Sequence, residues 1–455
     1  MRIPHEHRRG LEQIRATLDS LEPSKVEVCA AGNGGTKVVG DVTWARVTHF
    51  DDDCHPGRPR ILFIGQAEST HAHAWVDLLA GADINVRMFA LPGGVPPDSW
   101  EVRTYVSTPT SRRLDSRTRR RLYPAGRLAR APKRAYARLM SSDRALEQRW
   151  LAQVIREWKP NIVHTLGLDP AGEFYYDTRK QHGVEAAAVW VAQTRGGSDL
   201  SLARYDEARA SRLGAVLRAS DCILSDNAVN FEIARDMGVA TEQLSPIGTV
   251  PGTGGVDIDA LHSYASGRPS SRSVIVWPKA YECPWSKALP VFQALVTHWD
   301  RLPPCELHLL AMEPETRMWF HSLPGEIRQA CHIEDRIPRH EVLQLMGRAR
   351  VMLAPSLVDG TPNSMFEAMA TGALPILSPL DTIRPLVRDG SNVLFARNLY
   401  PDEIGEALVR AMHDDVLVDS AADRNLALVR QLADRSAIRP RVVALYESLA
   451  AGRLS

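Results

Sequence analysis

The sequence lacks any long hydrophobic run. No apolar stretch approaches the roughly 18 residues that a membrane-spanning helix requires. The N-terminal segment MRIPHEHRRGLEQIRATLDSLEP is charged and has no apolar centre of the kind found in secretory signals. We therefore expect a cytoplasmic protein. With 44% hydrophobic and 24% charged residues among 455, the composition is typical of a globular chain long enough for two domains with separate cores.

Paired cysteines and a strong net charge are also missing. The six cysteines are scattered and form no CxxC pair, which argues against a disulfide framework and against a zinc site. The formal net charge is only +1, so the total charge does not imply a polyanionic partner. We expect reduced, mostly buried thiols and no metal ion.

Positive charge is nevertheless concentrated in one stretch. Residues 111–140 contain eleven Arg or Lys and a single acidic residue, Asp115, interleaved with Leu and Tyr. Such a segment can lie on an anionic membrane surface or hold an anionic acceptor. We consider peripheral contact with the inner membrane face through Arg112 to Arg138, and a solvated basic loop is the equal alternative. No nucleic-acid partner is expected, because no recognisable nucleic-acid-binding module surrounds these arginines.

From Arg60 onward, strand-like and helix-like segments alternate. The apolar run RILFIG, a polar loop, a helix and INVRMFAL open a parallel doubly wound sheet, and the strands NIVHTLG, AAAVWVAQ and ASDCILSD follow. A second domain repeats the pattern with SVIVWP, CELHLLA, residues 351–354 and ALPILS. We predict an α/β fold with two Rossmann-like sheets facing a cleft. The expected divisions are an appendage of unknown role (1–58), an N-terminal domain (59–260 plus 436–455), a hinge (261–272) and a C-terminal domain (273–435).

Loops that follow the strands of such a sheet meet at its carboxyl edge, where ligands bind. In the first domain this rule places Gly65 and the nearby His71 after the first strand, and Arg195 and Asp199 in the loop TRGGSD. These residues are candidates for substrate contacts. For His71, a surface or capping role is an equal alternative.

The stretch DGTPNSMFEAMATG (359–372) lies between two short apolar runs and has the signals of a capped helix. Thr361 is a good N-cap residue, Pro362 suits the first helical position, and Gly372 suits the left-handed residue that ends a helix. The sequence therefore predicts a strand, a loop, a helix and a strand, with the start of the helix at the carboxyl edge of a sheet.

Two carboxylates and free helix amides occur together in this stretch. The amides around Asn363 and Ser364 favour a phosphate. Glu367 could accept two hydrogen bonds from the vicinal diol of a ribose, and Asp359 could reach a second ring beyond the phosphates. This arrangement is typical of a nucleotide-sugar site, although an ordinary capped helix has the same spacing.

The segments LAPSLVDGTPNSMFEAMATGALPILS and VRDGSNVLF resemble the retaining, GT-B-fold glycosyltransferases of family 4 (glycosyl transferases group 1), and the resemblance extends more loosely from Arg60 to the C-terminus. The family pattern of an acid, seven residues and a glutamate is met by Asp359 and Glu367. It implies that Glu367 holds the ribose and that Asp359 holds hydroxyls of the transferred sugar. The family usually has Glu at the first position, and Asp is shorter by about 1.5 Å.

The resemblance also implies roles for other residues. Lys279 and Lys287 would neutralise the departing diphosphate, and a final helix within Ser436 to Ser455 would cross back to the first domain. The implied catalytic residues are Asp359, Lys287 and Lys279. The implied donor-binding residues are Glu367, Asn363, Ser364, Pro362, Thr361, Gly360 and Gly65. The acceptor-side candidates are His164, Arg195, Asp199 and His71.

The resemblance implies a glycosyltransferase that moves a sugar from a nucleoside-diphosphate sugar to a hydroxyl of a glycan or lipid-linked acceptor, with retention of configuration. It implies no metal ion and no cofactor besides the nucleotide-sugar co-substrate. Two alternatives stay open. Nucleotide-sugar epimerases and phosphorylases share this fold, and a non-catalytic nucleotide-sugar-binding partner protein would be consistent with the shorter Asp359.

Overall fold

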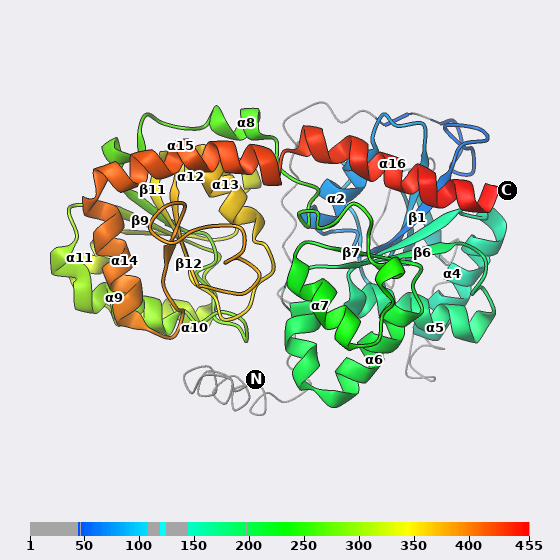
Figure 1. The fold of residues 1–455 in the computed structure, drawn as a ribbon, viewed down its shortest axis with the longest axis horizontal. Helices are drawn as coiled ribbons and strands as arrows, with labels where there is room; N and C mark the ends of the chain where they lie inside the picture. Colours follow the sequence, from blue (N-terminus) through cyan, green and yellow to red (C-terminus); the bar gives the residue numbers. More distant parts are fainter. Residues whose placement is uncertain (1–43, 46, 108–118, 124–143, 197, 455) are drawn as a thin grey trace. The chain divides into compact units, whose positions relative to one another are not determined.

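The computed structural model describes residues 44–45, 47–107, 119–123, 144–196 and 198–454 (Figure 1). These residues form two compact units. The N-terminal unit contains the described residues between Trp44 and Ala260, together with Gly360–Phe366 and the chain from Leu428 onward, and the C-terminal unit contains Leu261–Asp359 and Glu367–Ala427. Residues 1–43 of the expected appendage lie outside the described residues, as does most of the basic segment.

A seven-stranded, fully parallel sheet forms the centre of the N-terminal unit, with the order β4-β3-β2-β1-β5-β6-β7. The order reverses between β1 and β5, which is where ligands bind in doubly wound sheets. The strands are β1 (Arg60–Gly65), β2 (Asn85–Ala90), β3 (Arg103–Ser107), β4 (Arg120–Tyr123), β5 (Ile162–Leu166), β6 (Val189–Thr194) and β7 (Cys222–Ser225).

Helices cover both faces of this sheet, because successive side chains of a strand point to opposite faces. Ile61 and Phe63 pack with α2 and α16, whereas Leu62 and Ile64 pack with α4 to α7. In Figure 1, α16 lies on the same unit as α2 and β1. The helices are α2 (Thr70–Val76), α4 (Arg144–Trp158), α5 (Glu173–His182), α6 (Glu207–Arg218), α7 (Ala228–Asp236) and α16 (Arg435–Leu454), with short 3₁₀ or π turns η2 (Asp77–Leu79), η3 (Leu168–Gly172), η4 (Ser198–Leu202), η5 (Ala203–Tyr205) and η6 (Thr241–Gln243).

The segment before β1 is bound to buried arginines of the sheet. The guanidinium group of Arg87, 1% exposed, donates to the backbone carbonyl of Asp51 at 2.7 Å and to the hydroxyl of Tyr105 at 2.8 Å. Arg103, 5% exposed, donates to the backbone carbonyls of Phe50, at 3.0 Å, and Asp52. The acidic turn after Phe50 is therefore held through its backbone carbonyls.

The C-terminal unit is built on a six-stranded parallel sheet with the order β10-β9-β8-β11-β12-β13. Both sheets are parallel and doubly wound, so the predicted α/β class is confirmed. The strands are β8 (Val274–Trp277), β9 (Glu306–Leu310), β10 (Cys331–Glu334), β11 (Ala349–Ala354), β12 (Leu374–Leu377) and β13 (Leu394–Phe395).

In this unit α9 and α14 bury their apolar stripes against one face of the sheet, beside Leu307 and Leu309. The elements are α9 (Leu289–His298), α10 (Pro314–His321), α11 (Gly325–Gln329), α12 (Arg339–Arg348), α13 (Asn363–Thr371) and α14 (Pro401–His413), with the short turns η7 (Pro269–Ser271) and η8 (Trp299–Arg301). Two further helices, α8 (Ile258–His262) and α15 (Asp415–Leu432), contain residues of both units, as does α13, whose residues up to Phe366 belong to the N-terminal unit. Among the described residues, no helix is both long and apolar enough to cross a bilayer.

Candidate active site

Two loops at the carboxyl edge of the C-terminal sheet are held together by backbone hydrogen bonds. They follow β8 and β11, which are neighbours in the sheet. The first loop folds back on itself, because Cys283 and Ser286 exchange backbone bonds of 3.0 and 3.2 Å. Its Trp285 carbonyl then accepts from the amide of Leu357 in the second loop at 2.8 Å. Residues that are distant in sequence are thus fixed at one edge of the sheet.

Lys279 and Asp359, predicted from sequence as separate site residues, form an ion pair across these loops. Lys279 Nζ lies 3.3 Å from Asp359 Oδ2, and the two side chains are 40% and 24% exposed. The Asp359 carboxylate raises the pKa of Lys279 above its usual range, so the lysine carries its charge at any physiological pH. The backbone carbonyl of Asp359 also accepts from the hydroxyl of Thr382 at 2.9 Å.

The second predicted lysine has a different carboxylate partner. Lys287 Nζ lies 2.7 Å from Glu282 Oε1, and Glu282 Oε2 accepts from the backbone amide of Ala288 at 2.9 Å. The buried side chain of Asn398 bonds to both the amide (2.9 Å) and the carbonyl (3.0 Å) of Lys287, and to the carbonyl of Pro355 at 3.1 Å. Sequence reasoning missed Glu282 and Asn398. The pairing of Glu282 with Lys287 could have been predicted from the sequence, because Glu282 lies five residues before Lys287 in the same loop.

Glu367 lies inside α13 and is 7% exposed. Its Oε1 atom is paired with the guanidinium group of Arg339, the first residue of α12, whose side chain is 39% exposed. A buried carboxylate needs such a partner. Sequence reasoning did not find Arg339, because no local pattern links it to Glu367. The arrangement gives the carboxylate a cationic partner and places it one helical turn inside α13, as predicted.

The start of α13 differs from the prediction. The helix begins at Asn363 rather than at Pro362, because the Pro362 carbonyl accepts from the Met365 amide in a tight first turn. The hydroxyl of Thr361 donates to the Asp226 carbonyl at 2.9 Å, within the unit to which Gly360–Phe366 belong. The predicted end is confirmed, since Gly372 follows the last helical residue with φ +86°. Asn363 and Ser364 are the first two residues of the helix.

In the N-terminal unit, Gly65 is the last residue of β1 and lies against β5. A Cβ atom at this position would lie 3.1 Å from the Cβ of Leu166, closer than most packed side chains come. His71, in the first turn of α2, is exposed. The structure thus places Gly65 at the carboxyl edge of the sheet, near the point where the strand order reverses.

His164 is placed in the core and not at an accessible edge. It is fully buried, its Nδ1 lies 2.6 Å from the hydroxyl of Tyr446, and its ring packs beside Phe63 and Trp75. Burial lowers the pKa of His164 well below its usual value, so the ring is neutral. His164 is therefore closed to solvent, because β5 is covered on both faces, and its acceptor-side role stays a prediction.

Arg195 and Asp199 lie together after β6, as predicted. Asp199 accepts from the backbone amides of Arg195, at 3.1 Å, and Leu168, at 3.4 Å. Burial raises the pKa of Asp199 to about 7 and lowers that of Arg195 to about 10. Gln193 Oε1 accepts from the guanidinium group of Arg195 at 2.9 Å. The carboxylate therefore joins its own loop to the turn that follows β5 through backbone amides.

Part of the basic segment, residues 119–123, falls within the described residues and forms β4. Arg120 is 7% exposed, and its guanidinium group donates to four backbone carbonyls, those of Pro97, Trp100, Val102 and Arg119. Arg119 and Arg121 pair with Glu101 and Asp51. The described arginines thus have structural partners, and the remainder of Arg112 to Arg138 lies outside the described residues.

Comparisons with known proteins place this geometry in context. No curated protein matches the sequence. Among solved structures, Anabaena Alr3699/HepE in complex with UDP and glucose is 13% identical, with a TM-score of 0.61 over 85% of this chain and 98% of that one. Sucrose-phosphate synthase from Thermosynechococcus elongatus is 17% identical, with a TM-score of 0.62 over 87% and 100%. The α,α-trehalose 6-phosphate synthase from Burkholderia multivorans is 15% identical, with a TM-score of 0.61 over 87% and 99%.

At these identities the likeness shows the fold alone, and the fold is the two-domain α/β fold of GT-B glycosyltransferases. The sequence match covers most of the C-terminal unit, where the two lysines and the two carboxylates lie, together with Gly360–Phe366. Residues 274–414 match the family described as Glycosyl transferases group 1.

Proposed function

We propose that this protein is a retaining glycosyltransferase that moves a sugar from a nucleoside-diphosphate sugar to a hydroxyl acceptor without a metal ion. The observation that carries the proposal is the pair of lysines at the carboxyl edge of the C-terminal sheet, each fixed beside a carboxylate. This is the part of the chain that matches the Glycosyl transferases group 1 family.

The lysines supply the electrostatic part of the mechanism. In the free protein their charges are balanced by Asp359 and Glu282. A diphosphate would bring two further negative charges, and both ammonium groups can donate to its oxygens without giving up their present partners, because each ammonium group has three N–H donors. Charge that is fixed in place before the reaction stabilises a leaving group at little reorganisation cost.

The two acidic residues of the pattern would hold the two rings of the donor. Glu367 would accept from the ribose diol after exchanging its Arg339 partner, whose exposed position allows it to move. Asp359 would accept from hydroxyls of the transferred sugar while it continues to orient Lys279.

The reaction follows from these positions. The bond between the anomeric carbon and the diphosphate oxygen breaks, and its electron pair leaves with the diphosphate. The acceptor oxygen forms the new bond on the same face of the sugar, and its proton passes to an oxygen of the departing phosphate. We assign no enzymic nucleophile and no general base. The acceptor class is a glycan or a lipid-linked sugar.

The proposal is tested by isothermal titration calorimetry with a panel of nucleoside diphosphates and nucleoside-diphosphate sugars. Transfer assays with glycan and lipid-linked acceptors follow. The uridine series comes first, because the Anabaena protein was solved with UDP, glucose and UDP-glucose. We compare Glu367→Gln with the matched control Glu326→Gln, which changes an exposed glutamate on α11.

Loss of charge-assisted hydrogen bonds to the ribose, worth about 1.5–3 kcal/mol, should weaken donor binding by Glu367→Gln about 10- to 150-fold. The control should match the wild type. Donor binding that is unchanged in Glu367→Gln would contradict the site. Three other outcomes would support the alternative functions of this fold. Release of a sugar phosphate that requires inorganic phosphate would indicate a phosphorylase, and epimerisation of the donor without transfer would indicate an epimerase. Donor binding without turnover would indicate a non-catalytic binding protein.

A further inference from the structure

A second cluster of side chains lies in the C-terminal unit, away from the loops with the lysines. Glu306 and His308 are on β9 and His332 is on β10, and their ligand-type atoms lie within 4.8 Å of one another. The imidazole rings of His308 and His332 stack with centroids 4.7 Å apart and an interplanar angle of 18°. His308 Nε2 lies 3.9 Å from Glu306 Oε2.

The register of the two strands explains why these side chains converge. His332 is paired directly with His308, and Glu306 is two residues before His308, so all three point to the same face of the sheet. Cys305 and Cys331 alternate with them and pack into the apolar core on the opposite face. Glu306 is the first residue of β9, whereas the candidate active site follows the carboxyl ends of β8 and β11.

His308 is the central member of the cluster. It is 7% exposed, and neither of its ring nitrogens has a hydrogen-bond partner. A buried polar atom without a partner costs free energy, and such a group in a folded protein calls for a specific explanation. Glu306 and His332 are exposed, so their side chains can move toward His308 at little cost.

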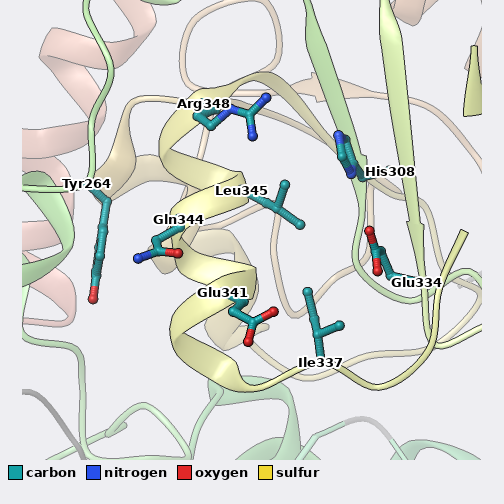
Figure 2. A pocket seen from close by; sticks show the side chains of 8 residues that line it. All are labelled: Tyr264, His308, Glu334, Ile337, Glu341, Gln344, Leu345 and Arg348. Atoms are coloured by element: carbon teal, nitrogen blue, oxygen red, sulfur yellow. The ribbon is translucent and has the colours of Figure 1, made fainter. Parts of the chain in front are cut away.

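A cavity of about 540 Å³ gives solvent access to His308. In Figure 2, His308 and Glu334 form the strand side of this cavity, and Glu341, Gln344, Leu345 and Arg348 of α12 form the helix side. Its charged lining contains two carboxylates against one guanidinium group, which favours the entry of a cation.

We propose that Glu306, His308 and His332 form a binding site for a divalent transition-metal ion of the zinc class. Two imidazole nitrogens and one carboxylate oxygen are a ligand set that zinc accepts, and a water molecule from the cavity would complete a tetrahedron. Tetrahedral zinc with bonds of about 2.0–2.1 Å holds its ligand atoms about 3.3 Å apart, so the cluster needs to contract. The ion would give a buried ring nitrogen its partner and cross-link the edge strand β10 to β9.

The test uses the full-length protein without a histidine tag, freed of metal by a chelator. We titrate it with ZnCl₂ in competition with a chromophoric chelator, and with Co²⁺ followed by its visible absorption, which is intense when the ion is tetrahedral. The variants are His332→Ala and Glu306→Gln, which change exposed residues and preserve the buried His308. The matched control is His321→Ala, an exposed histidine at the end of α10.

We expect one Zn²⁺ per chain. Loss of a supporting group around a metal typically lowers affinity about 10- to 100-fold, so loss of a ligand should cost at least as much in both variants and abolish the tetrahedral Co²⁺ spectrum. His321→Ala should bind like the wild type. The proposal is overturned if the wild type binds no Zn²⁺, if both variants keep wild-type affinity, or if the control loses affinity equally. None of these outcomes depends on the proposed transferase activity.

Discussion

Replacement of Lys287 by methionine separates its catalytic from its structural role. Methionine keeps most of the side-chain volume and removes the charge. In the proposed reaction the ammonium group stabilises the departing diphosphate. Removal of one preorganised donor from such a site typically costs about 2.7–4 kcal/mol of transition-state stabilisation. We therefore expect Lys287→Met to lower kcat about 100- to 1000-fold.

The same change affects stability through Glu282. At the observed 2.7 Å, two unit charges attract by about 6 kcal/mol at an effective dielectric constant of 20, and desolvation offsets most of this energy. The two side chains are 22% and 14% exposed, so the pair lies between the surface and buried cases. We expect a loss of about 1–3 kcal/mol in the free energy of unfolding, because Glu282 keeps its charge without its cation.

The double variant Lys287→Met/Glu282→Gln resolves the two effects. It removes the uncompensated carboxylate, while the amide oxygen can still accept from Ala288, so thermal stability should recover and activity should stay low. The assays are differential scanning calorimetry, in which about 1 kcal/mol corresponds to about 2–4 °C for a domain of this size, and the initial rate of nucleoside diphosphate release. Lys180→Met, which changes an exposed lysine on α5, is the matched control. Recovery of both stability and activity in the double variant would refute a catalytic role for Lys287.

Two further predictions concern buried polar groups. Asn398→Ala removes three hydrogen bonds to the backbone of Lys287 and Pro355. Because buried amide and carbonyl groups then lose their partners, the free energy of unfolding measured in urea should fall by about 2–4 kcal/mol. A loss below about 0.5 kcal/mol would contradict this role. Burial raises the pKa of Asp199 to about 7, so the folded state binds the proton of this carboxyl group more tightly than the unfolded state does. The stability that the protonated Asp199 contributes below about pH 4 is therefore lost as the pH rises to about 7. Asp199→Asn should flatten this decline in chemical unfolding measured across the same range, and an unchanged slope would contradict the assignment.

The sequence predicts the central elements well, because their signals are local. The apolar run from Arg60 to Gly65 coincides with β1, and the segment NIVHTLG contains β5. The strands β3 and β4 were not predicted, since each begins with an arginine that the fold buries against backbone carbonyls. The sequence alone does not distinguish an arginine that is buried against backbone carbonyls from one that is exposed to solvent.

The candidate site was predictable only in part, for the same physical reason. Lys279, Lys287, Asp359 and Glu367 follow from spacing and resemblance, but the ionic partners of Lys279, Asp359 and Glu367 depend on tertiary structure. Arg339 lies 28 residues before Glu367 in sequence. The burial of His164 was not predictable from its place near the carboxyl end of a strand, because it depends on the helices that cover both faces of the sheet. The cluster around His308 was missed because strand register, not sequence spacing, brings its members together.

The contacts between the segment before β1 and the buried arginines bear on how the N-terminal unit can be shortened. A fragment that began at Arg60 would contain the whole parallel sheet, and it would appear complete by secondary structure. It would nevertheless leave the guanidinium groups of Arg87 and Arg103 without the carbonyls of residues 50–52, and stranded charges of this kind cost several kcal/mol each. Truncation for expression or crystallisation should therefore retain Trp44 and the residues that follow it.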